Sequence, residues 1–351
     1  MPPVGIAMAG CSAIAGTHLT ALKEIPAARV VGVWSRSFEK TRVFSEQYQT
    51  RAYRSYDELL ADPEVHAVIV CLPSGYHAEY GMQAAAAGKH VIVEKPIDVT
   101  LAKARALIET CRKHHRRLSV IFQSRFTPAA RKLRRALDQG LLGRLILGDA
   151  YVKWYRSPAY YSSSAWRGTK AIDGGGALIN QAIHTIDLLQ WMMGGAKRVC
   201  GVIRTSTHAI ESEDLGAALV EFRNGALGLI EGSTAIQPGF KERIEIHGQK
   251  GSVILEGGNI TTWKVEGCNE AEYVDEQKVS YGSTSSPAIS PVNHKAQLEE
   301  IVDALQKDTD SSVNGEEGLK ALQIVLGIYE SSAKGQWVEL PSSATFITTR
   351  A

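Results

Sequence analysis

The chain has 351 residues, of which 44% are hydrophobic and 22% are charged. At roughly 100–200 residues per domain, this length predicts two domains with separate hydrophobic cores, and the composition argues against a largely disordered chain. The 39 basic and 37 acidic residues leave a net charge of +2, which is too small for the basic surface typical of proteins that bind nucleic acids or anionic membranes.

Several features favour a cytoplasmic protein without a metal site. The apolar run at 67–73 is far shorter than the roughly 18 residues that a membrane-spanning helix needs. The first residues, Met-Pro-Pro-Val-Gly, lack the basic and apolar regions of a signal peptide. The two closest of the five cysteines, Cys71 and Cys111, are 40 positions apart, so neither a disulfide framework nor a zinc pair is expected.

The first 123 residues alternate between short apolar strands and helices. Continuous apolar strands separated by helices are typical of a parallel sheet that is covered on both faces. We expect strands at 4–9, 30–34, 67–72, 91–93 and 118–122, and helices that end near 24, 48, 61, 87 and 114.

The pattern changes beyond residue 143, where strands follow one another with short turns. Asn224-Gly225 is a hairpin signal between two of these strands, and such neighbours favour an antiparallel sheet. We therefore expect one domain at 1–123 and a second α/β domain at 124–351. The second contains expected strands at 145–155, 199–205, 216–222, 227–234, 243–247 and 253–256, helices at 177–193, 294–306 and 316–332, and a polar loop at 270–290.

The turn after the first strand has the position and partial sequence of a dinucleotide-binding fingerprint. Gly10 suits the tight turn, and Ala15 suits the small position where helix and strand pack closely. Ser12 replaces the glycine that usually lets the backbone approach the pyrophosphate, although its hydroxyl could donate to a phosphate. Gly10, Ser12, Ala13 and Ile14 are therefore candidate cofactor-binding residues, and an ordinary turn is the alternative.

The end of the second strand favours NADP(H) over NAD(H). An acidic residue at this position would accept hydrogen bonds from the adenosine ribose of NAD. The chain instead has Ser35 and Arg36, and a guanidinium can pair with a 2′-phosphate that a serine does not repel. NAD(H) remains possible, because Arg36 is also compatible with a solvated turn.

Several short motifs together resemble the glucose–fructose oxidoreductase, inositol dehydrogenase and rhizopine catabolism (Gfo/Idh/MocA) family. They are the Gly10 turn, Pro73-Ser74-Gly75-Tyr76-His77, Glu94-Lys95-Pro96, Trp166-Arg167, and Gly174-Gly175-Gly176 followed by Asn180 and His184. The resemblance implies an N-terminal Rossmann domain and a C-terminal α/β domain with a largely antiparallel, open-faced sheet. It also implies a homodimer or homotetramer that uses this sheet as its interface, and hydride transfer to or from a sugar or cyclitol.

The resemblance assigns roles to individual residues. Lys95 matches the lysine that reaches the nicotinamide ribose and the reacting oxygen, and His184 matches the usual acid/base histidine. Glu94 is expected to orient its loop or to touch the cofactor, and Leu72, Pro73 and His77 to lie near the cofactor. The chain departs from many members at Asn180, where they carry aspartate, so a Lys/Asp/His arrangement is in doubt.

The residue types and their spacing support this chemistry independently of the resemblance. Removing hydride from a carbinol carbon requires a base for the hydroxyl proton, and histidine is suited to that task near neutral pH. On an α-helix, Asn180, His184 and Asp187 would lie along one stripe, with Asp187 able to orient His184 and Asn180 able to bind a substrate hydroxyl. Lys95 would stabilise a developing alkoxide.

Nearby aromatic and basic residues complete the candidate site. Trp166 and Arg167 are candidates to close over cofactor or substrate, and Tyr155 is a candidate to stack on a sugar ring, although strand packing explains Tyr155 equally well. The leading hypothesis is an NAD(P)-dependent oxidoreductase acting on a ring hydroxyl or carbonyl of a sugar, cyclitol or sugar derivative. A glycosidase or lyase that retains NAD without net redox, and a non-catalytic cofactor-binding protein, are the alternatives.

Overall fold

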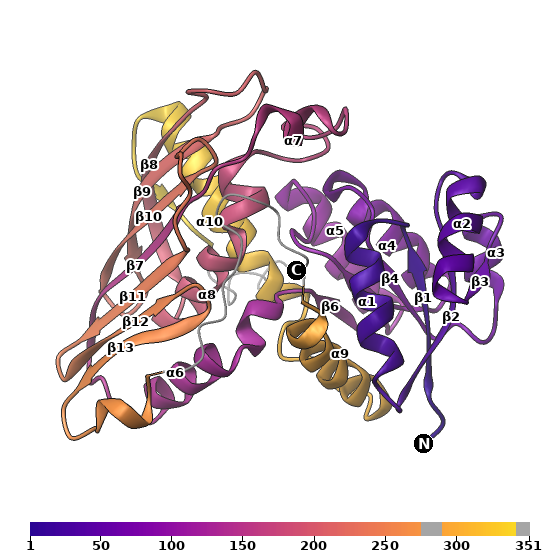
Figure 1. Ribbon diagram of the computed structural model, residues 1–351, viewed down its shortest axis with the longest axis horizontal. Helices are drawn as coiled ribbons and strands as arrows, with labels where there is room; N and C mark the ends of the chain where they lie inside the picture. Colours follow the sequence, from indigo (N-terminus) through magenta and orange to yellow (C-terminus); the bar gives the residue numbers. More distant parts are fainter. Residues whose placement is uncertain (275–289, 342–351) are drawn as a thin grey trace, which may run out of the picture. The chain divides into compact units, whose positions relative to one another are not determined.

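The chain folds into two compact units, each built around its own sheet (Figure 1). The computed structural model describes residues 1–274 and 290–341. Within these, the first unit comprises residues 1–123 and 290–319, and the second comprises residues 124–274 and 320–341. No helix of the described residues is long and apolar enough to cross a membrane.

The first unit is a Rossmann domain with a six-stranded parallel sheet in the order β3-β2-β1-β4-β5-β6. Its strands are β1 (Val4–Ala9), β2 (Ala28–Trp34), β3 (Arg51–Ala52), β4 (Ala67–Val70), β5 (His90–Val93) and β6 (Leu118–Val120). Its helices are α1 (Ala13–Lys23), α2 (Phe38–Tyr48), α3 (Tyr56–Ala61), η1 (Ser74–Tyr76), α4 (His77–Ala86), α5 (Leu101–Lys113) and α9 (Pro291–Gln306). The strand order reverses between β1 and β4, and dinucleotides bind at the carboxyl ends of the strands at such a reversal.

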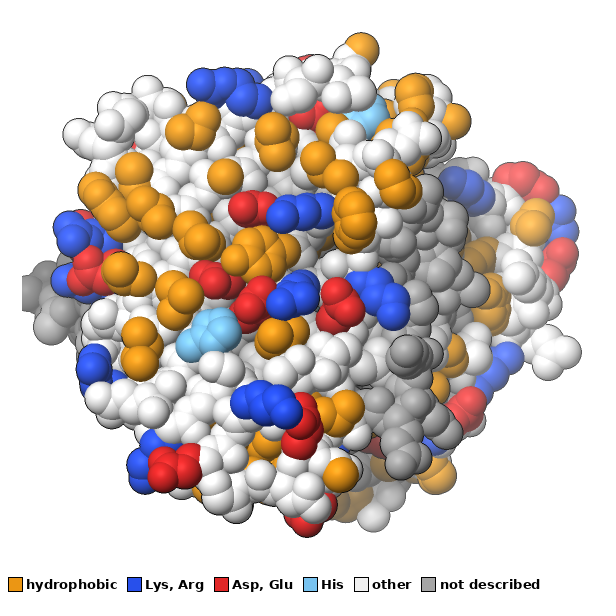
Figure 2. Space-filling model, turned by 60° about the vertical axis from the view of Figure 1, so that its left-hand side comes forward, with side chains coloured by type: hydrophobic (Ala, Val, Ile, Leu, Met, Phe, Trp, Pro, Cys, Tyr) orange, Lys and Arg blue, Asp and Glu red, His pale blue; other side chains and the backbone are white. Residues whose placement is uncertain are grey.

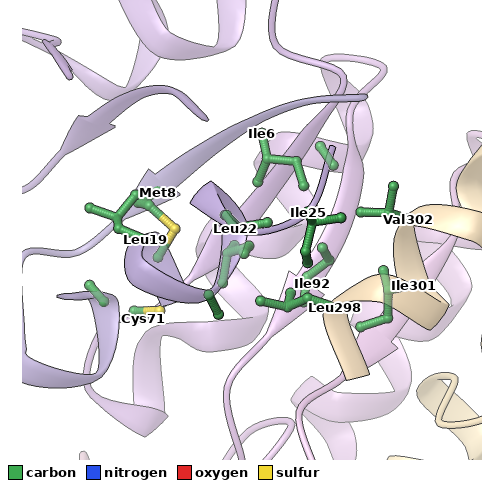
Figure 3. Close-up of a cluster of buried hydrophobic side chains, with 14 of the residues drawn as sticks. Ile6, Met8, Leu19, Leu22, Ile25, Cys71, Ile92, Leu298, Ile301 and Val302 are labelled. Carbon is green, nitrogen blue, oxygen red and sulfur yellow. The ribbon is translucent and has the colours of Figure 1, made fainter. Parts of the chain in front are cut away.

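The core of the first unit joins segments from both ends of the chain (Figure 3). Leu19 and Leu22 of α1 belong to the same buried cluster as Leu298 and Ile301 of α9. The sequence placed everything beyond residue 123 in the second domain, whereas α9 packs against α1 and is part of the first unit. The reason is that the apolar stripe of α9 is buried by a helix almost 280 positions earlier in the chain, which local sequence patterns do not reveal.

The second unit is built on an eight-stranded sheet in the order β13-β12-β11-β7-β10-β9-β8-β14. Every neighbouring pair is antiparallel except β7 and β10, which confirms the largely antiparallel sheet. The strands are β7 (Leu145–Lys153), β8 (Ala196–Arg204), β9 (Leu215–Phe222), β10 (Leu227–Ser233), β11 (Arg243–Gly248), β12 (Gly251–Glu256), β13 (Asn259–Val265) and β14 (Val338–Glu339). The helical segments are η2 (Gln123–Phe126), α6 (Pro128–Asp138), α7 (Pro158–Ser162), η3 (Ala177–Ala182), α8 (Ile183–Met193), η4 (Glu270–Glu272) and the larger part of α10 (Gly315–Lys334), whose first residues belong to the first unit.

One face of this sheet is covered and the other is open. Segments η3 and α8 pack on the central strands, and Ile328 of α10 lies against Gly201 of β8. On β9 and β10, buried residues alternate with exposed ones, so the uncovered face carries the exposed aliphatic side chains. Figure 2 shows this face, on which the exposed residues include Val202, Leu215, Leu219, Leu227 and Leu229.

Two differences from the sequence-based elements concern the second unit. Strand β13 was not expected, although Gly257-Gly258 before it is a hairpin signal and both glycines have positive φ. The helix expected at 177–193 is not uniform, because η3 is a π-helix and only α8 is an α-helix. Most of the loop expected at 270–290 lies outside the described residues.

Candidate functional site

The turn after β1 requires glycine at its first position. Gly10 has a φ of +123°, and a Cβ atom there would lie 2.6 Å from the carbonyl oxygen of Cys71. Ser12 is the N-cap of α1, and its Oγ accepts a hydrogen bond from the Ala15 amide at 3.4 Å. The amides of Ala13 and Ile14 belong to the first helical turn, which has no intrahelical acceptors and can bind an anion.

The end of β2 presents a hydroxyl and a guanidinium instead of a carboxylate. Thr41 fixes the backbone there, because its Oγ1 accepts from the Ser35 amide at 2.9 Å. The exposed Arg36 guanidinium lies 5.0 Å from the centre of the Tyr76 ring. Among the described residues, Arg36 forms no ion pair. This is a cation at the position where a carboxylate would favour NAD.

His77 holds together the loops that follow β4 and β5. The side chain is 1% exposed, and its Nδ1 and Nε2 lie 2.7 Å from the carbonyl oxygens of Pro96 and Leu72, respectively. The sequence placed His77 near the cofactor, and the structure directs both ring nitrogens toward these carbonyls. His77 therefore supports the loops that carry Pro73 and Lys95. The Lys95–Pro96 peptide bond is cis.

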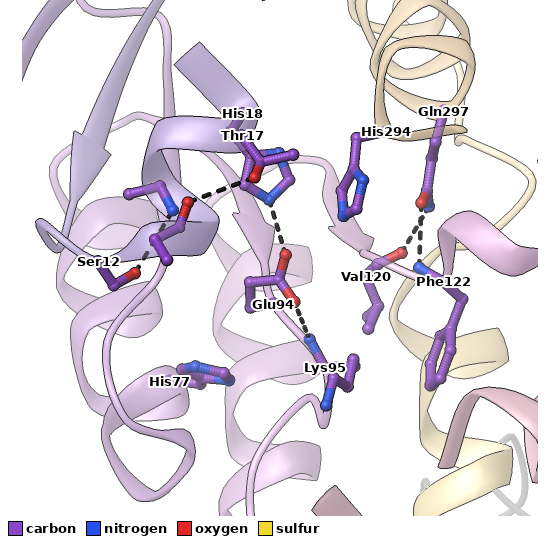
Figure 4. A network of polar contacts seen from close by, with 12 residues as sticks. Ser12, Thr17, His18, His77, Glu94, Lys95, Val120, Phe122, His294 and Gln297 are labelled. Atoms are coloured by element: carbon purple, nitrogen blue, oxygen red, sulfur yellow. Dashed lines mark hydrogen bonds and ion pairs between the residues drawn. The ribbon is translucent and has the colours of Figure 1, made fainter. Parts of the chain in front are cut away.

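A buried relay of polar groups fixes the backbone of Lys95 (Figure 4). His18 Nε2 lies 2.7 Å from Glu94 Oε1, and the other carboxylate oxygen accepts from the Lys95 amide at 3.1 Å. Burial opposes ionisation of Glu94, but its hydrogen bond to His18 and the charges around it lower its pKa to about 2. Glu94 is therefore an ionised carboxylate near neutral pH. His18 of α1 is its partner.

The same region contains three side chains of metal-binding type. One ligand atom from each of His18, Glu94 and His294 lies within 4.8 Å of the others. Two ligands on a tetrahedral zinc with bonds of about 2.0 Å are about 3.3 Å apart. The 2.7 Å between His18 and Glu94 is shorter and suits a shared proton. Burial lowers the pKa of His294 to about 4, so His294 is neutral near pH 7.

In the second unit, Glu213 organises the start of η3. Its carboxylate accepts hydrogen bonds from the Gly176 amide at 3.0 Å, the Leu178 amide at 2.7 Å and the Tyr329 hydroxyl at 2.8 Å. Burial raises the pKa of Glu213. These contacts begin the helical segment that carries Asn180 and His184, both half-buried. Because η3 is π-helical, Asn180 does not keep the α-helical spacing to His184 that the predicted stripe assumed.

The carboxylate that position 180 lacks is present in a neighbouring side chain. Asn180 Nδ2 donates to Asp173 Oδ1, and the other oxygen of Asp173 accepts from the Gly168 amide at 2.8 Å. Asp173 is 2% exposed. The sequence analysis did not select Asp173, although it directly precedes the triple glycine. The side chain of Asn180 is therefore hydrogen-bonded to a buried aspartate.

Asp187 forms a buried ion pair with Arg125. The Arg125 Nε and Nη2 atoms donate to its two oxygens at 2.7 and 2.6 Å, and both side chains are at most 4% exposed. Gln190 Nε2 donates to the same carboxylate at 3.3 Å. Arg125 compensates the charge of Asp187, and the expected role of Asp187 in orienting His184 stays a prediction. Arg125 was not selected, because nothing local in the sequence indicates a partner 62 positions away.

Aromatic and basic side chains gather before η3. Arg167 lies 4.2 Å from the centre of the Tyr160 ring and 4.8 Å from that of Trp166. Tyr155 forms an isolated bridge to Ala235. Arg156, which the sequence analysis missed, lies 4.9 Å from the centre of the Trp154 ring and is 5% exposed. The cluster contains the predicted Trp166 and Arg167, and the backbone carbonyl of the predicted Tyr155 accepts a hydrogen bond from Arg156.

Known proteins match both parts of the chain. A model described as "Oxidoreductase family, NAD-binding Rossmann fold" matches residues 4–122, and one described as "GFO/IDH/MocA C-terminal domain" matches residues 130–254. Myo-inositol 2-dehydrogenase of Thermotoga maritima is 29% identical over 73% of this chain and 76% of its own. Levoglucosan dehydrogenase of Pseudarthrobacter phenanthrenivorans is 27% identical over 86% of each chain. The WlbA dehydrogenase of Bordetella pertussis, solved with NADH and UDP-GlcNAcA, has a TM-score of 0.87 and 28% identity and covers 97% of this chain and 100% of its own.

Proposed function

Because the chain belongs to the Gfo/Idh/MocA oxidoreductase family, we propose that it transfers a hydride between a nicotinamide cofactor and a ring hydroxyl or carbonyl of a sugar, cyclitol or sugar derivative. The names of its relatives, which include dehydrogenases of inositol and levoglucosan, support this substrate class. The observation that carries the proposal is the glycine turn at the β1–β4 reversal, combined with Lys95 held beside an ionised, buried Glu94.

The first unit fits a dinucleotide, because the close approach of Gly10 to Cys71 leaves no room for a Cβ atom in the turn. The bound nicotinamide would accept or supply the hydride. We propose that this chain holds the cofactor with Gly10, Ser12, Ala13, Ile14, Ser35, Arg36, Leu72, Pro73, Glu94, Lys95, Trp166 and Arg167, and that His77 contributes by fixing the loops around it.

We further propose a preference for NADP(H). The Arg36 guanidinium stacks on Tyr76 without a carboxylate partner among the described residues, so a 2′-phosphate would supply one. Ser35 adds no negative charge that would repel the phosphate. Because the WlbA relative was solved with NADH, the proposed preference for NADP(H) rests on Ser35 and Arg36 of this chain and not on that relative.

The proton and the reacting oxygen are assigned to three side chains. His184 takes the hydroxyl proton during oxidation and returns it during reduction, because an imidazole exchanges protons near neutral pH. Lys95 donates to the reacting oxygen and stabilises its developing negative charge. Asn180 binds a substrate hydroxyl, and its hydrogen bond to Asp173 orients its amide.

The open face of the second sheet supports a homo-oligomer. Side chains such as Leu219 and Leu227, which are 50% and 55% exposed, lie on this face. A face with several exposed aliphatic residues is typical of a protein–protein interface. We propose that a second copy of the chain covers it. Light scattering of the native chain and of a Leu219→Glu variant tests this, since the charge should dissociate the oligomer.

The function is tested by cofactor titration and turnover. Protein fluorescence is titrated with NADPH and with NADH, and turnover with a sugar and cyclitol panel is followed at 340 nm. We expect tighter binding of NADPH, net reduction of NADP⁺, and at least a 100-fold loss of kcat in His184→Ala. His247→Ala, a half-buried histidine on β11, is the matched control. Substrate conversion without net redox would point to the retained-cofactor glycosidase, and normal turnover by His184→Ala would refute the assigned base.

A further inference from the structure

Two arginines of the second unit are buried, and they differ in their partners. Arg125 is 4% exposed and forms the two-bond ion pair with Asp187. Arg156 is 5% exposed, yet within the described residues it has no carboxylate within 4 Å. A buried cation is stable when an anion compensates it, as Arg125 shows. Arg156 lacks that compensation from the residues that the structure describes.

The hydrogen bonds of Arg156 leave donors unused. Nη1 donates to the Tyr155 carbonyl at 3.0 Å and Nη2 to Gln181 Oε1 at 2.9 Å, and both acceptors are neutral. Nε is buried, and no described residue accepts a hydrogen bond from it. A guanidinium has five N–H groups in a fork that matches a carboxylate or a phosphate. The vacant donors therefore have the chemistry of an oxyanion site.

A second uncompensated arginine adds to the positive charge. Arg167 Nη1 donates to the Tyr160 hydroxyl at 2.6 Å, and its Nε donates to Ser163 Oγ at 3.2 Å. Both partners are neutral, and no ion pair of Arg167 occurs in the described part of the chain. Tyr160 also lies 5.8 Å from Arg156, so the two guanidinium groups share one ring. Burial, reinforced by the charge of Arg167, lowers the pKa of Arg156.

This pair of arginines is connected to the candidate substrate residues. Gln181 accepts from Arg156 and donates through Nε2 to Asn180 Oδ1 at 2.8 Å and to the Tyr160 hydroxyl at 2.9 Å. Asn180 in turn donates to Asp173. Asp173 is the nearest carboxylate along this network, and two amide side chains separate it from Arg156.

We propose that Arg156, with Arg167 beside it, binds an oxyanion of the substrate, so that the substrate is an acidic sugar bearing a carboxylate or a phosphate. This inference rests on the proposed function and narrows its substrate class. Stacking on Trp154 and Tyr160 stabilises the cation in the absence of substrate. Stacking leaves the Nε donor unused, whereas an oxyanion would satisfy both that donor and the charge.

The experiment compares sugars that differ only at C6. Glucose, glucuronate and glucose 6-phosphate, and the corresponding galactose series, are titrated calorimetrically into protein saturated with NADP⁺ or NAD⁺, and turnover is measured in parallel. The variants are Arg156→Met, which removes the donors, and Arg156→Lys, which keeps the charge without the fork. Arg204→Met is the matched control, because Arg204 is an exposed arginine whose Nη1 donates to the backbone carbonyl of Ile203. Circular dichroism and cofactor titration establish that each variant is folded.

The native chain should bind at least one acidic sugar about 100-fold more tightly than its neutral counterpart. Arg156→Met should remove this preference, Arg156→Lys should weaken it at least about 10-fold, and Arg204→Met should leave it intact. A carboxylate and a phosphate are distinguished by which series shows the effect. If Arg156→Met does not fold, the loss of acidic preference in Arg156→Lys is the test of the inference.

Two binding results overturn the inference: equal or tighter binding of the neutral sugars, and an acidic preference that survives in both Arg156 variants. Turnover of neutral sugars alone would overturn it and leave the proposed oxidoreductase intact. Binding of an acidic sugar that depends on Arg156, without turnover of any sugar, would support the oxyanion site and count against the proposed reaction. Failure of the oxyanion site and failure of the proposed hydride transfer are therefore distinguishable.

Discussion

Replacing His18 with leucine should reverse the pH dependence of stability in the first unit. His18 is fully buried and lies 2.7 Å from Glu94, which is 7% exposed. The pKa of Glu94 is about 2, against an ordinary value of 4.5, which corresponds to about 3 kcal/mol at about 1.4 kcal/mol per pH unit. Removing one member of a buried pair costs a similar amount, about 3–5 kcal/mol.

The sign of the pH dependence of stability follows from the direction in which the pKa of Glu94 is shifted in each protein. In the native chain the pKa of Glu94 is lowered, so its contribution is present above pH 4.5 and is lost as the pH falls from 4.5 to about 2. In His18→Leu the buried carboxylate has no imidazole partner, and burial raises its pKa above 4.5. Its contribution is then largest below pH 4.5 and is lost as the pH rises through the raised value. Between pH 5 and 8 the variant should therefore lose stability, by up to about 1.4 kcal/mol per pH unit.

The local stability of the first unit is measured by amide hydrogen exchange of β4 and β5, which is monitored by mass spectrometry at pH 5.5, 6.5 and 7.5. His18→Gln keeps an N–H donor and should resemble the native chain. The double variant His18→Leu with Glu94→Gln has no carboxylate to titrate, so its stability should not depend on pH in this range. Parallel pH profiles for native chain and His18→Leu would refute the assignment of Glu94 as an ionised partner of His18.

Three further changes test the site. Gly10→Ala places a Cβ atom 2.6 Å from the Cys71 carbonyl oxygen at a positive φ. Calorimetry should therefore show a lower Tm, and fluorescence titration should show at least about 10-fold weaker NADPH binding. A native Tm and native NADPH affinity would mean that the turn accommodates the methyl group easily. Arg36→Ala should weaken NADPH binding by about 10-fold or more and NADH binding much less, and equal losses would show that Arg36 does not read the 2′ position. Asp187→Ala leaves Arg125 buried without its anion, which should cost about 3–5 kcal/mol in urea unfolding, and a loss below about 1 kcal/mol would contradict a buried, fully formed pair.

The candidate site could be predicted from the sequence only where its residues belong to local motifs. The turn at Gly10, the Glu94-Lys95-Pro96 loop and the segment with Asn180 and His184 were all selected, and their roles in catalysis and cofactor binding stay predictions. Asp173 and Arg156 were missed. Both were missed because their roles depend on residues that only the fold brings close: Asp173 is bonded to Asn180, and Arg156 is buried with no carboxylate within 4 Å among the described residues.

The sequence by itself determined the fold class, because apolar runs of strand length, helical periodicity and turn residues are local properties. Tertiary structure decided which distant segments share a core, as with α9 on α1. It also decided which buried charges are paired: within the described residues Arg125 pairs with Asp187, whereas Arg156 has no carboxylate partner. It also decided that Glu213 begins a π-helix where an α-helix was expected. The physical reason is that desolvation and hydrogen-bond pairing depend on what surrounds a side chain in space, and the partners here come from positions 30 to 280 residues away along the chain.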